Sequence, residues 1–221
     1  MDNFFRDAET EPLAEQLLRD QEDKRAFIAG VRGAFRAQAT VAELLAEARS
    51  ADEALPRILE ALCAALDFEL ATLWTVTADG EHLACECHRG DGRALRFSAA
   101  TQLLELPRGD GPSGTAWMDM EQVWAADFRG LVAGPRAAIA AAEGLRGVCS
   151  IPVVVGGSVR SVLELATHAT RPFEETTSLA LTAIAGQLGQ FVERELIQER
   201  YVALSALLEQ QVYVNASPLA A

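Results

Sequence analysis

Hydrophobic positions follow two different spacings along this chain. Over 51–68 they recur every three or four residues, which predicts a helix with one apolar face made of Leu55, Ile58, Leu59, Leu62, Leu66 and Phe68. After residue 68 the spacing changes to two, which predicts two β-hairpins, turning at Asp79-Gly80 and at Gly156-Gly157. The segment of about 55 residues between the hairpins is expected to form short helices that cover one face of the sheet and close a cavity.

Further helices are predicted at both ends of the chain. Residues 12–37 show a spacing of three and four with Pro12 in the first turn, and Thr40 and Ser50 are predicted N-caps of two more helical pieces. The last helix begins after Phe173. It contains no proline for about 40 residues, so it would be roughly 60 Å long, more than the sheet can cover.

The part of this last helix beyond the sheet contains a short heptad seam. Its apolar positions step by four, three and four, and they are Ile197, Tyr201, Leu204 and Leu208. With mixed charges beside it, this seam predicts a parallel homodimer through a coiled coil. The alternatives are that this half of the helix frays or folds back on the N-terminal helix of its own chain. The tail that follows is predicted to be disordered.

Composition sets the class of protein and excludes some partners. The chain has 221 residues, of which 50% are hydrophobic, and a formal net charge of −13. So acidic a chain repels nucleic acid and anionic membranes, and we expect neither as a partner. It shows no signal peptide and no apolar run of membrane-spanning length. Four irregularly spaced cysteines suit reduced thiols, so we expect a cytoplasmic protein.

Catalytic and metal-binding patterns are not recognisable. The three histidines, His82, His88 and His168, have no nucleophile at a familiar spacing, so we expect a non-catalytic protein. Cys85 and Cys87 would share one face of a strand while His88 points to the other face. Small core cysteines account for this pair more simply than a metal does, and no metal site is expected.

Two segments resemble a known family. LELPRGDGPSGTAWMDMEQVWAADFRG, over 104–130, and EGLRGVCSIPVVV, over 143–155, resemble the second half of a GAF domain. The resemblance extends over 51–195. It implies an α+β fold of the GAF/PAS type, an antiparallel sheet with helices on both faces, between an N-terminal helical extension (1–50) and a C-terminal signalling and dimerisation helix with its tail (196–221).

What the resemblance implies for function is regulation. Such domains hold a small molecule and pass a signal through their terminal helices to an output protein or domain, as in two-component regulation. Here the candidate pocket residues are Trp74, Trp117, Trp124, Asp127, Phe128, Arg136, Cys149 and Ile151. Asp127 and Arg136 would supply the polar ends, and an arginine among aromatic rings suits a small anionic or planar ligand. Against this, tryptophans in a domain of this size are mostly core residues.

Other roles known in this family match the chain less well. Bilin attachment needs a cysteine that the segment GPRAAIAAAEGLRG lacks, and of the cyclic-nucleotide pattern only Phe173 is present. Three alternatives stay open: a ligand-free dimerisation and docking module, a thiol-based enzyme like the free methionine sulfoxide reductases using Cys149 or the pair Cys85 and Cys87, and haem ligation by one histidine. The sequence names no cofactor.

Overall fold

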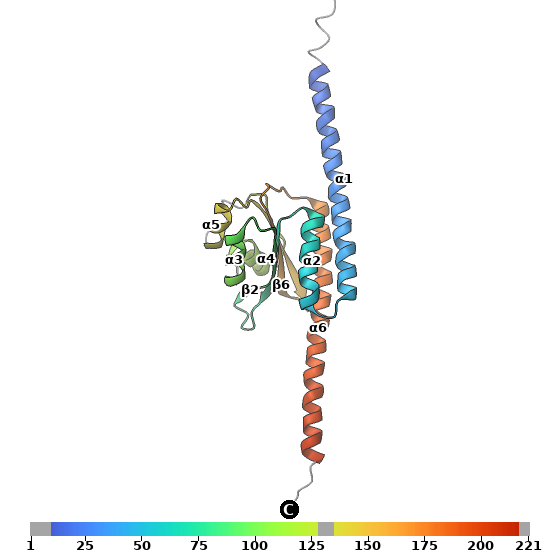
Figure 1. Ribbon diagram of the computed structural model, residues 1–221, viewed down its shortest axis with the longest axis vertical. Coiled ribbons are helices and arrows are strands. Elements are labelled where there is room, and N and C mark those ends of the chain that lie inside the picture. The colour runs from blue at the N-terminus through green and yellow to red at the C-terminus, as the bar shows by residue number, and fades with distance from the viewer. Residues whose placement is uncertain (1–9, 128–134, 217–221) are drawn as a thin grey trace, which may run out of the picture.

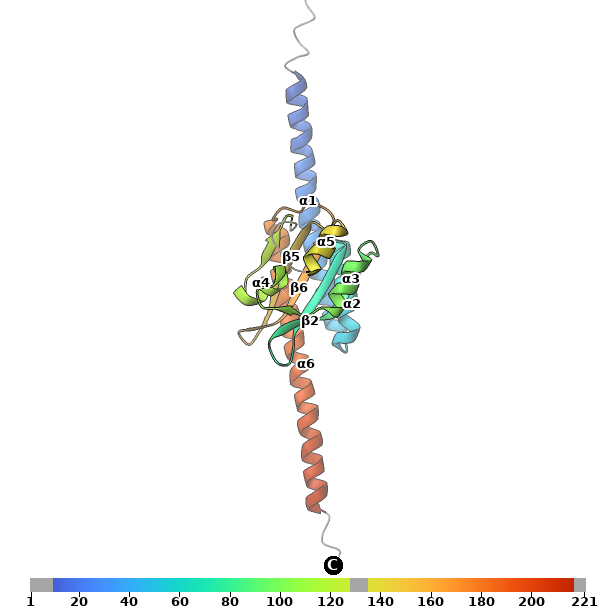
Figure 2. The same ribbon diagram turned by 90° about the vertical axis from the view of Figure 1, so that its left-hand side faces the viewer.

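The computed structural model describes residues 10–127 and 135–216, with twelve helices and strands in these ranges. Six strands form one antiparallel sheet in the order β3-β2-β1-β6-β5-β4. Helices α1, α2 and α6 lie on one side of it, and the short helices α3, α4 and α5 lie on the other (Figures 1 and 2). This is the α+β fold, with helices on both faces of an antiparallel sheet, that the sequence predicts.

The sheet consists of two hairpins and two short edge strands. The strands are β1 (Leu70–Val76), β2 (His82–Gly90), β3 (Leu106–Pro107), β4 (Val123–Ala125), β5 (Gly147–Val155) and β6 (Ser158–Thr167). The β5–β6 turn uses Gly156 and Gly157, both with positive φ, which a two-residue hairpin turn of this hand requires. Both predicted hairpins are therefore confirmed, and their first and last strands pair at the centre of the sheet.

The helices differ greatly in length. They are α1 (Thr10–Glu47), α2 (Ala51–Leu66), α3 (Leu95–Leu103), α4 (Gly111–Asp119), α5 (Pro135–Ala142) and α6 (Glu175–Ala216). Ser50 caps α2, as predicted, by accepting a hydrogen bond from the backbone N–H of Glu53. The predicted cap at Thr40 is wrong. The first helix continues through it to Glu47, because the buried stripe of Ala34 and Ala37 extends without a break to Val41, Leu44 and Leu45.

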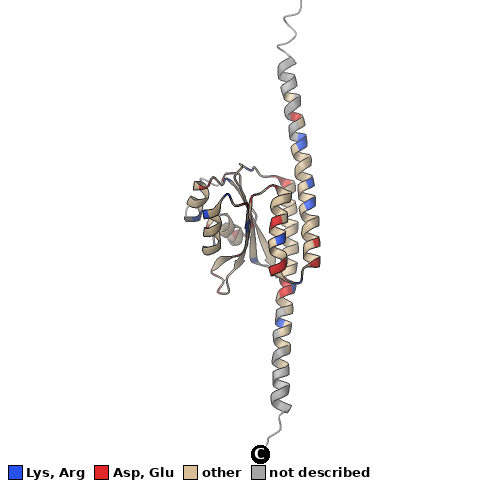
Figure 3. Cartoon of the chain, in the orientation of Figure 1, with Lys and Arg blue, Asp and Glu red and all other residues tan. Residues whose placement is uncertain are grey.

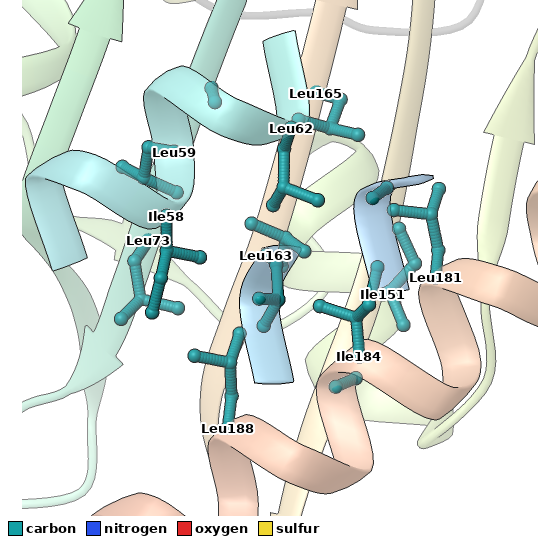
Figure 4. Close-up of a cluster of buried hydrophobic side chains, with 14 of the residues drawn as sticks. Ile58, Leu59, Leu62, Leu73, Ile151, Leu163, Leu165, Leu181, Ile184 and Leu188 are labelled. Atoms are coloured by element: carbon teal, nitrogen blue, oxygen red, sulfur yellow. The ribbon is translucent and has the colours of Figure 1, made fainter. Parts of the chain in front are cut away.

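The main core lies between the sheet and the three helices α1, α2 and α6. All six residues predicted for the apolar face of α2 are buried there. Figure 4 shows side chains of α2, among them Ile58 and Leu62, and of α6, among them Ile184 and Leu188, closing over Leu163 at the centre of the sheet. Each such leucine contributes about 1.5–3 kcal/mol on burial. This face of the sheet is therefore filled with apolar side chains.

The two long helices extend beyond the domain in opposite directions. They pack side by side at the level of the sheet. There α1 also packs on α2, and Gly33 of α1 lies so close to the carbonyl of Ala65 of α2 that a Cβ would overlap it. Beyond this contact the N-terminal arm of α1 rises from one end of the domain, and the C-terminal arm of α6 leaves the other end (Figures 1 and 2). Within the described residues, no helix has the length and apolar character needed to span a bilayer.

Candidate functional site

One face of the sheet carries a line of polar side chains at a single register. Thr72 of β1 pairs with His88 of β2 on one side and with Glu164 of β6 on the other, and Glu164 pairs with Ser150 of β5. Directly opposed residues of neighbouring strands project from the same face, so the four side chains cross the sheet in a row. We call them the polar row. It faces the short helices, while charge is rare along most of the sheet (Figure 3).

Glu164 is the centre of this row. Only 2% of it is exposed, and it accepts hydrogen bonds from both nitrogens Nη1 (3.1 Å) and Nη2 of Arg136 on α5, and from Ser113 Oγ on α4 (2.6 Å). Burial alone would raise the pKa of this carboxyl. The Arg136 charge and the hydrogen bonds from Arg136 and Ser113 outweigh burial and hold the pKa of Glu164 below its ordinary value. Glu164 is therefore an ionised carboxylate deep inside the protein.

The guanidinium of Arg136 is surrounded as closely as the carboxylate. Its Nε donates to Thr101 Oγ1 at 3.2 Å. Its Cζ lies 4.9 Å from the ring centroid of Trp74 and 4.3 Å from that of Phe97, both within cation–π range. The Arg136 side chain is 13% exposed. The insert between the hairpins thus places one cation against one anion on the sheet.

The outer end of the row is His88. Its Nδ1 lies 2.9 Å from Thr72 Oγ1, and its Nε2 lies 2.9 Å from Ser98 Oγ on α3. Burial lowers the pKa of His88, and Arg136 and Arg89 lower it further, against the opposite effect of Glu164. Both ring nitrogens have hydroxyl partners, so iron ligation by His88 would require one of these bonds to break.

The structure divides the predicted pocket residues between the two faces of the sheet. Trp74, Trp117 and Arg136 lie on the face of the polar row, where Trp117 packs with Trp74 and holds Arg108 over its ring at 4.4 Å. Cys149 and Ile151 lie on the other face, in the core beneath α2 and α6. The expectation that these five residues line one cavity is wrong, because the residue between Cys149 and Ile151 is the one that faces the insert.

The remaining predicted residues lie at or outside the edge of the site. Trp124 pairs with Cys149 and so shares its face, and its ring meets Phe173 edge to face at 5.6 Å. Asp127 lies 3.6 Å from Arg146 Nε, with both side chains partly exposed. Phe128 lies outside the described residues. The carboxylate beside Arg136 is therefore Glu164 and not Asp127.

A β-bulge decides the position of the two neighbouring cysteines. Leu73 pairs with Cys87 and Trp74 with Cys85, so Glu86 is the extra residue of β2. Cys87 consequently packs toward the helical core, whereas Cys85 packs with Trp74 on the insert side. The expectation that both share one face is wrong. In the part of the chain that the structure describes, no group of three His, Cys, Asp or Glu side chains could hold a metal ion.

The thiols are poor nucleophiles. Burial, and then Glu69, raise the pKa of Cys63 to about 12, and burial followed by Cys87 raises the pKa of Cys85 to about 11. Burial also raises the pKa of Cys87 and, far more, that of Cys149. A reactive cysteine requires the opposite shift of its pKa.

Sequence reasoning missed most of the site. It did not select the polar row, nor Phe97, Thr101 and Ser113. One signal was available, since Glu164 is the single carboxylate of its strand and lies between Leu163 and Leu165, and such a residue is buried only with a partner. The partner is 28 residues away in sequence, on a short helix.

The site is connected to α6 through the edge strand β4. Gln122, just before β4, donates from Nε2 to the carbonyl of Ser178 at 3.2 Å and accepts from Ser178 Oγ at 2.7 Å. Trp124 Nε1 donates to the carbonyl of Arg171 at 3.1 Å, in the segment that leads into α6. Ser113 is on α4, which immediately precedes β4 in the chain. A displacement of Ser113 would therefore have to pass through one intermediate element, β4, to reach the start of α6.

Comparisons with known proteins agree with this architecture. The profile of the family described as GAF domain matches residues 48–193, more than half of the chain. No curated protein matches the sequence. The solved GAF domain of a phosphoenolpyruvate-protein phosphotransferase from Coxiella burnetii has a TM-score of 0.65 at 16% identity, with 77% of this chain and 98% of that chain covered.

Two further solved structures share the fold. The free methionine-R-sulfoxide reductase from Neisseria meningitidis, in complex with its substrate, has a TM-score of 0.60 at 20% identity, covering 72% of this chain and 88% of that one. The nlh2 GAF domain from A. aeolicus, in an inactive state, has a TM-score of 0.56 at 16% identity, covering 74% of this chain and 97% of that one.

Proposed function

Because this chain belongs to the GAF domain family, we propose that it is a non-catalytic regulatory sensor whose small-molecule ligand binds at the polar row. The observation that carries the proposal is that one buried carboxylate, Glu164, holds both α4 and α5. A ligand that competes for Glu164 changes how both helices are held. For this to regulate anything, the ligand must bind one arrangement of the helices better than the other.

The route of the signal follows from the contacts of β4. Displacement of α4 moves β4, and the bonds of Gln122 and Trp124 pass this to the N-terminal end of α6. The C-terminal arm of α6 then carries the change to a signalling output protein or domain. We place this activity in the cytoplasm, in line with the free thiols and acidic composition.

A homodimer through both arms is part of the proposal. On α6 the seam residues Ile197, Tyr201, Leu204 and Leu208 are 55–71% exposed in the single chain. On α1 a second apolar stripe is also exposed, formed by Phe27, Ile28, Val31 and Phe35. A second copy related by a two-fold axis along the arms would cover both stripes at once.

The chemistry of the thiols supports a non-catalytic role. The reductase from Neisseria meningitidis shares the fold, but each thiol here has a raised pKa, and Cys149 faces the helical core rather than the polar row. A thiol enzyme needs an accessible thiolate beside its substrate. We therefore do not favour this alternative.

A second candidate function is a ligand-free dimerisation and docking module. The observation that favours it is that Glu164, Arg136, Ser113 and Thr101 already satisfy one another without a ligand. In such a module the polar row would serve only to fix α4 and α5 on the sheet.

Native mass spectrometry of the purified full chain separates the two candidates. The sensor predicts a dimer, with a small molecule as extra mass or with a mass shift after incubation with a metabolite library. A dimer that carries no extra mass and takes up nothing from the library would establish the docking module instead.

Two variants locate the bound mass. Glu164→Gln removes the charge of the polar row and should abolish ligand uptake. Ser161→Ala is the matched control, because Ser161 is on the same strand but bonds Thr75 at 3.2 Å on the other face. Equal uptake by both variants would place the ligand elsewhere on the protein.

A further inference from the structure

The surroundings of Arg136 form a complete recognition site for a guanidinium group. Glu164 accepts from Nη1 and Nη2, Thr101 accepts from Nε, and the rings of Trp74 and Phe97 lie within cation–π distance. Paired bonds to a carboxylate and stacking on aromatic rings are the contacts by which proteins bind guanidinium most selectively. We call these four residues the cation cage.

None of the four cage residues is on α5, the helix that carries Arg136. Trp74 is on β1, Phe97 and Thr101 are on α3, and Glu164 is on β6. Glu164 is also fixed by Ser113, and Trp74 and Thr101 are both fully buried. The sheet therefore fixes Trp74 and the buried negative charge of Glu164 independently of α5. Helix α3 is also fixed from the other side, because the backbone N–H groups of Arg96 and Phe97 donate to Glu143, just after α5.

Of the two partners in the Arg136–Glu164 ion pair, Arg136 can leave the site and Glu164 cannot. Glu164 is in the middle of a central strand with paired strands on both sides, so its carboxylate cannot turn to solvent without breaking the sheet. Arg136 is the second residue of an eight-residue helix at the periphery. A ligand that replaces one member of the pair must therefore replace Arg136. An anion would have to bind while leaving Glu164 buried and unpaired, which is strongly unfavourable.

One polar group beside Arg136 has no hydrogen-bond partner among the described residues. The buried Nε1 of Trp74 has no hydrogen-bond acceptor among the described residues. An arginine side chain carries only donors, so Arg136 cannot provide that acceptor. A ligand with a guanidinium head and an oxygen nearby could. The net charge of −13 also raises the local concentration of cations over anions.

We propose that the cation cage is the ligand site of this protein and that its ligand is a monosubstituted guanidinium compound, which competes with the guanidinium of Arg136. The inference rests on the proposed sensor function and names its ligand class. Two unsubstituted nitrogens match the oxygens of Glu164, and one substituted N–H matches Thr101. Binding of the ligand releases Arg136 and so breaks the ion pair that ties α5 to Glu164 of the sheet.

Ethylguanidinium is a suitable probe, with ethylammonium as the matched cation that lacks the planar head. Titration of the full chain at constant ionic strength, followed by ligand-observed NMR, should show saturable binding of ethylguanidinium to the wild type. Arg136→Ala removes the competing group, so its dissociation constant should be about tenfold or more lower than that of the wild type. Arg146→Ala, which removes a peripheral arginine paired with Asp127, should leave the constant unchanged.

Several results would overturn the inference. These are equal binding of ethylammonium, equal affinity of the wild type and Arg136→Ala, or binding to Arg136→Ala alone, which would make Arg136 a permanent occupant. If Arg136→Ala does not fold, the comparison of wild type with Glu164→Gln decides, since loss of the carboxylate must abolish binding.

Experiment can distinguish failure of the guanidinium assignment from failure of the proposed sensor function. Purified protein that carries another small molecule at the polar row, but does not bind ethylguanidinium, would retain the sensor and remove the guanidinium assignment. Protein that carries nothing and binds neither probe nor library compound would remove both.

Discussion

Ser113 Oγ donates a 2.6 Å hydrogen bond to Glu164 Oε2, the same oxygen that accepts from Arg136 Nη1. Ser113 is on α4 and Arg136 is on α5, so two helices that follow different loops share one oxygen atom of the sheet as a hydrogen-bond acceptor. Removing either bond is therefore expected to loosen one helix while the other holds. The two attachments can be tested separately.

Replacing Ser113 by alanine should lower the free energy of unfolding by about 1.5–3 kcal/mol, since a hydrogen bond to a charged and buried group is lost. Chemical denaturation measures this. Thr115→Ala on the same helix is the control, because its hydroxyl makes only a 3.4 Å bond to the carbonyl of Gly109. A loss for Ser113→Ala no larger than the control's, within about 0.5 kcal/mol, would show that the bond to Glu164 contributes little to stability.

Alanine at Gly33 should destabilise the protein, although alanine normally favours a helix over glycine by about 1 kcal/mol. The added Cβ would overlap the carbonyl oxygen of Ala65 and push α1 away from α2, which we expect to cost about 1–3 kcal/mol. Gly186→Ala, on an exposed part of α6 with open space around it, should instead stabilise by about 0.5–1 kcal/mol. Thermal melts of the two variants should therefore shift in opposite directions. Stabilisation by both would contradict the close α1–α2 contact.

The free energy of unfolding should decrease as the pH is lowered, because His88 becomes protonated. Its pKa in the folded protein is below the ordinary value of about 6.5, so the unfolded chain binds the extra proton first. Stability contributed by the neutral ring is therefore present above about pH 6.5 and is lost as pH falls through the lower folded pKa, at up to about 1.4 kcal/mol per pH unit.

The variant His88→Asn tests this directly. Its free energy of unfolding should depend less on pH below about 6.5 than that of the wild type. His82→Asn, at a side chain that is 40% exposed, serves as the control. An unchanged slope in His88→Asn would mean that the acid sensitivity has another source, among the carboxylates that titrate lower.

Substitution of Leu204 by glutamate should separate the proposed dimer. It would place two like charges at the centre of the seam and raise the dissociation constant of the dimer by about a hundredfold or more. Val202 is 61% exposed and lies beside the seam rather than in it, so Val202→Glu adds the same charge and should leave the dimer intact. Sedimentation velocity distinguishes the two. A monomeric wild type, or equal weakening by both variants, would contradict dimerisation through this seam.

The sequence was sufficient for the elements with long periodic patterns. The apolar face of α2 and both glycine turns could be predicted because each depends on neighbours within a few residues. The faces of the sheet could not. A bulge at Glu86 reverses the side of Cys85 relative to Cys87, and nothing in an alternating pattern reveals one extra residue.

The site was hidden for a related reason. The row from His88 to Ser150 exists only once four strands have a definite register, and that register joins segments far apart in the chain. Arg136 was predicted as a polar end of the pocket, but its partner was expected to be a ligand rather than Glu164. The lone carboxylate of β6, flanked by Leu163 and Leu165, was the one clue that the local sequence offered.

The staggered, parallel overlap of α1 and α6 also has a mechanical meaning. Because the arms leave the domain at opposite ends, tension between them acts along the helix axes and loads the shared interface in shear (Figure 1). Contacts such as Val41 and Leu188 in the common core would then resist together rather than one after another. The sheet and its polar row lie to one side of this axis, so tension along the two helices would not load them.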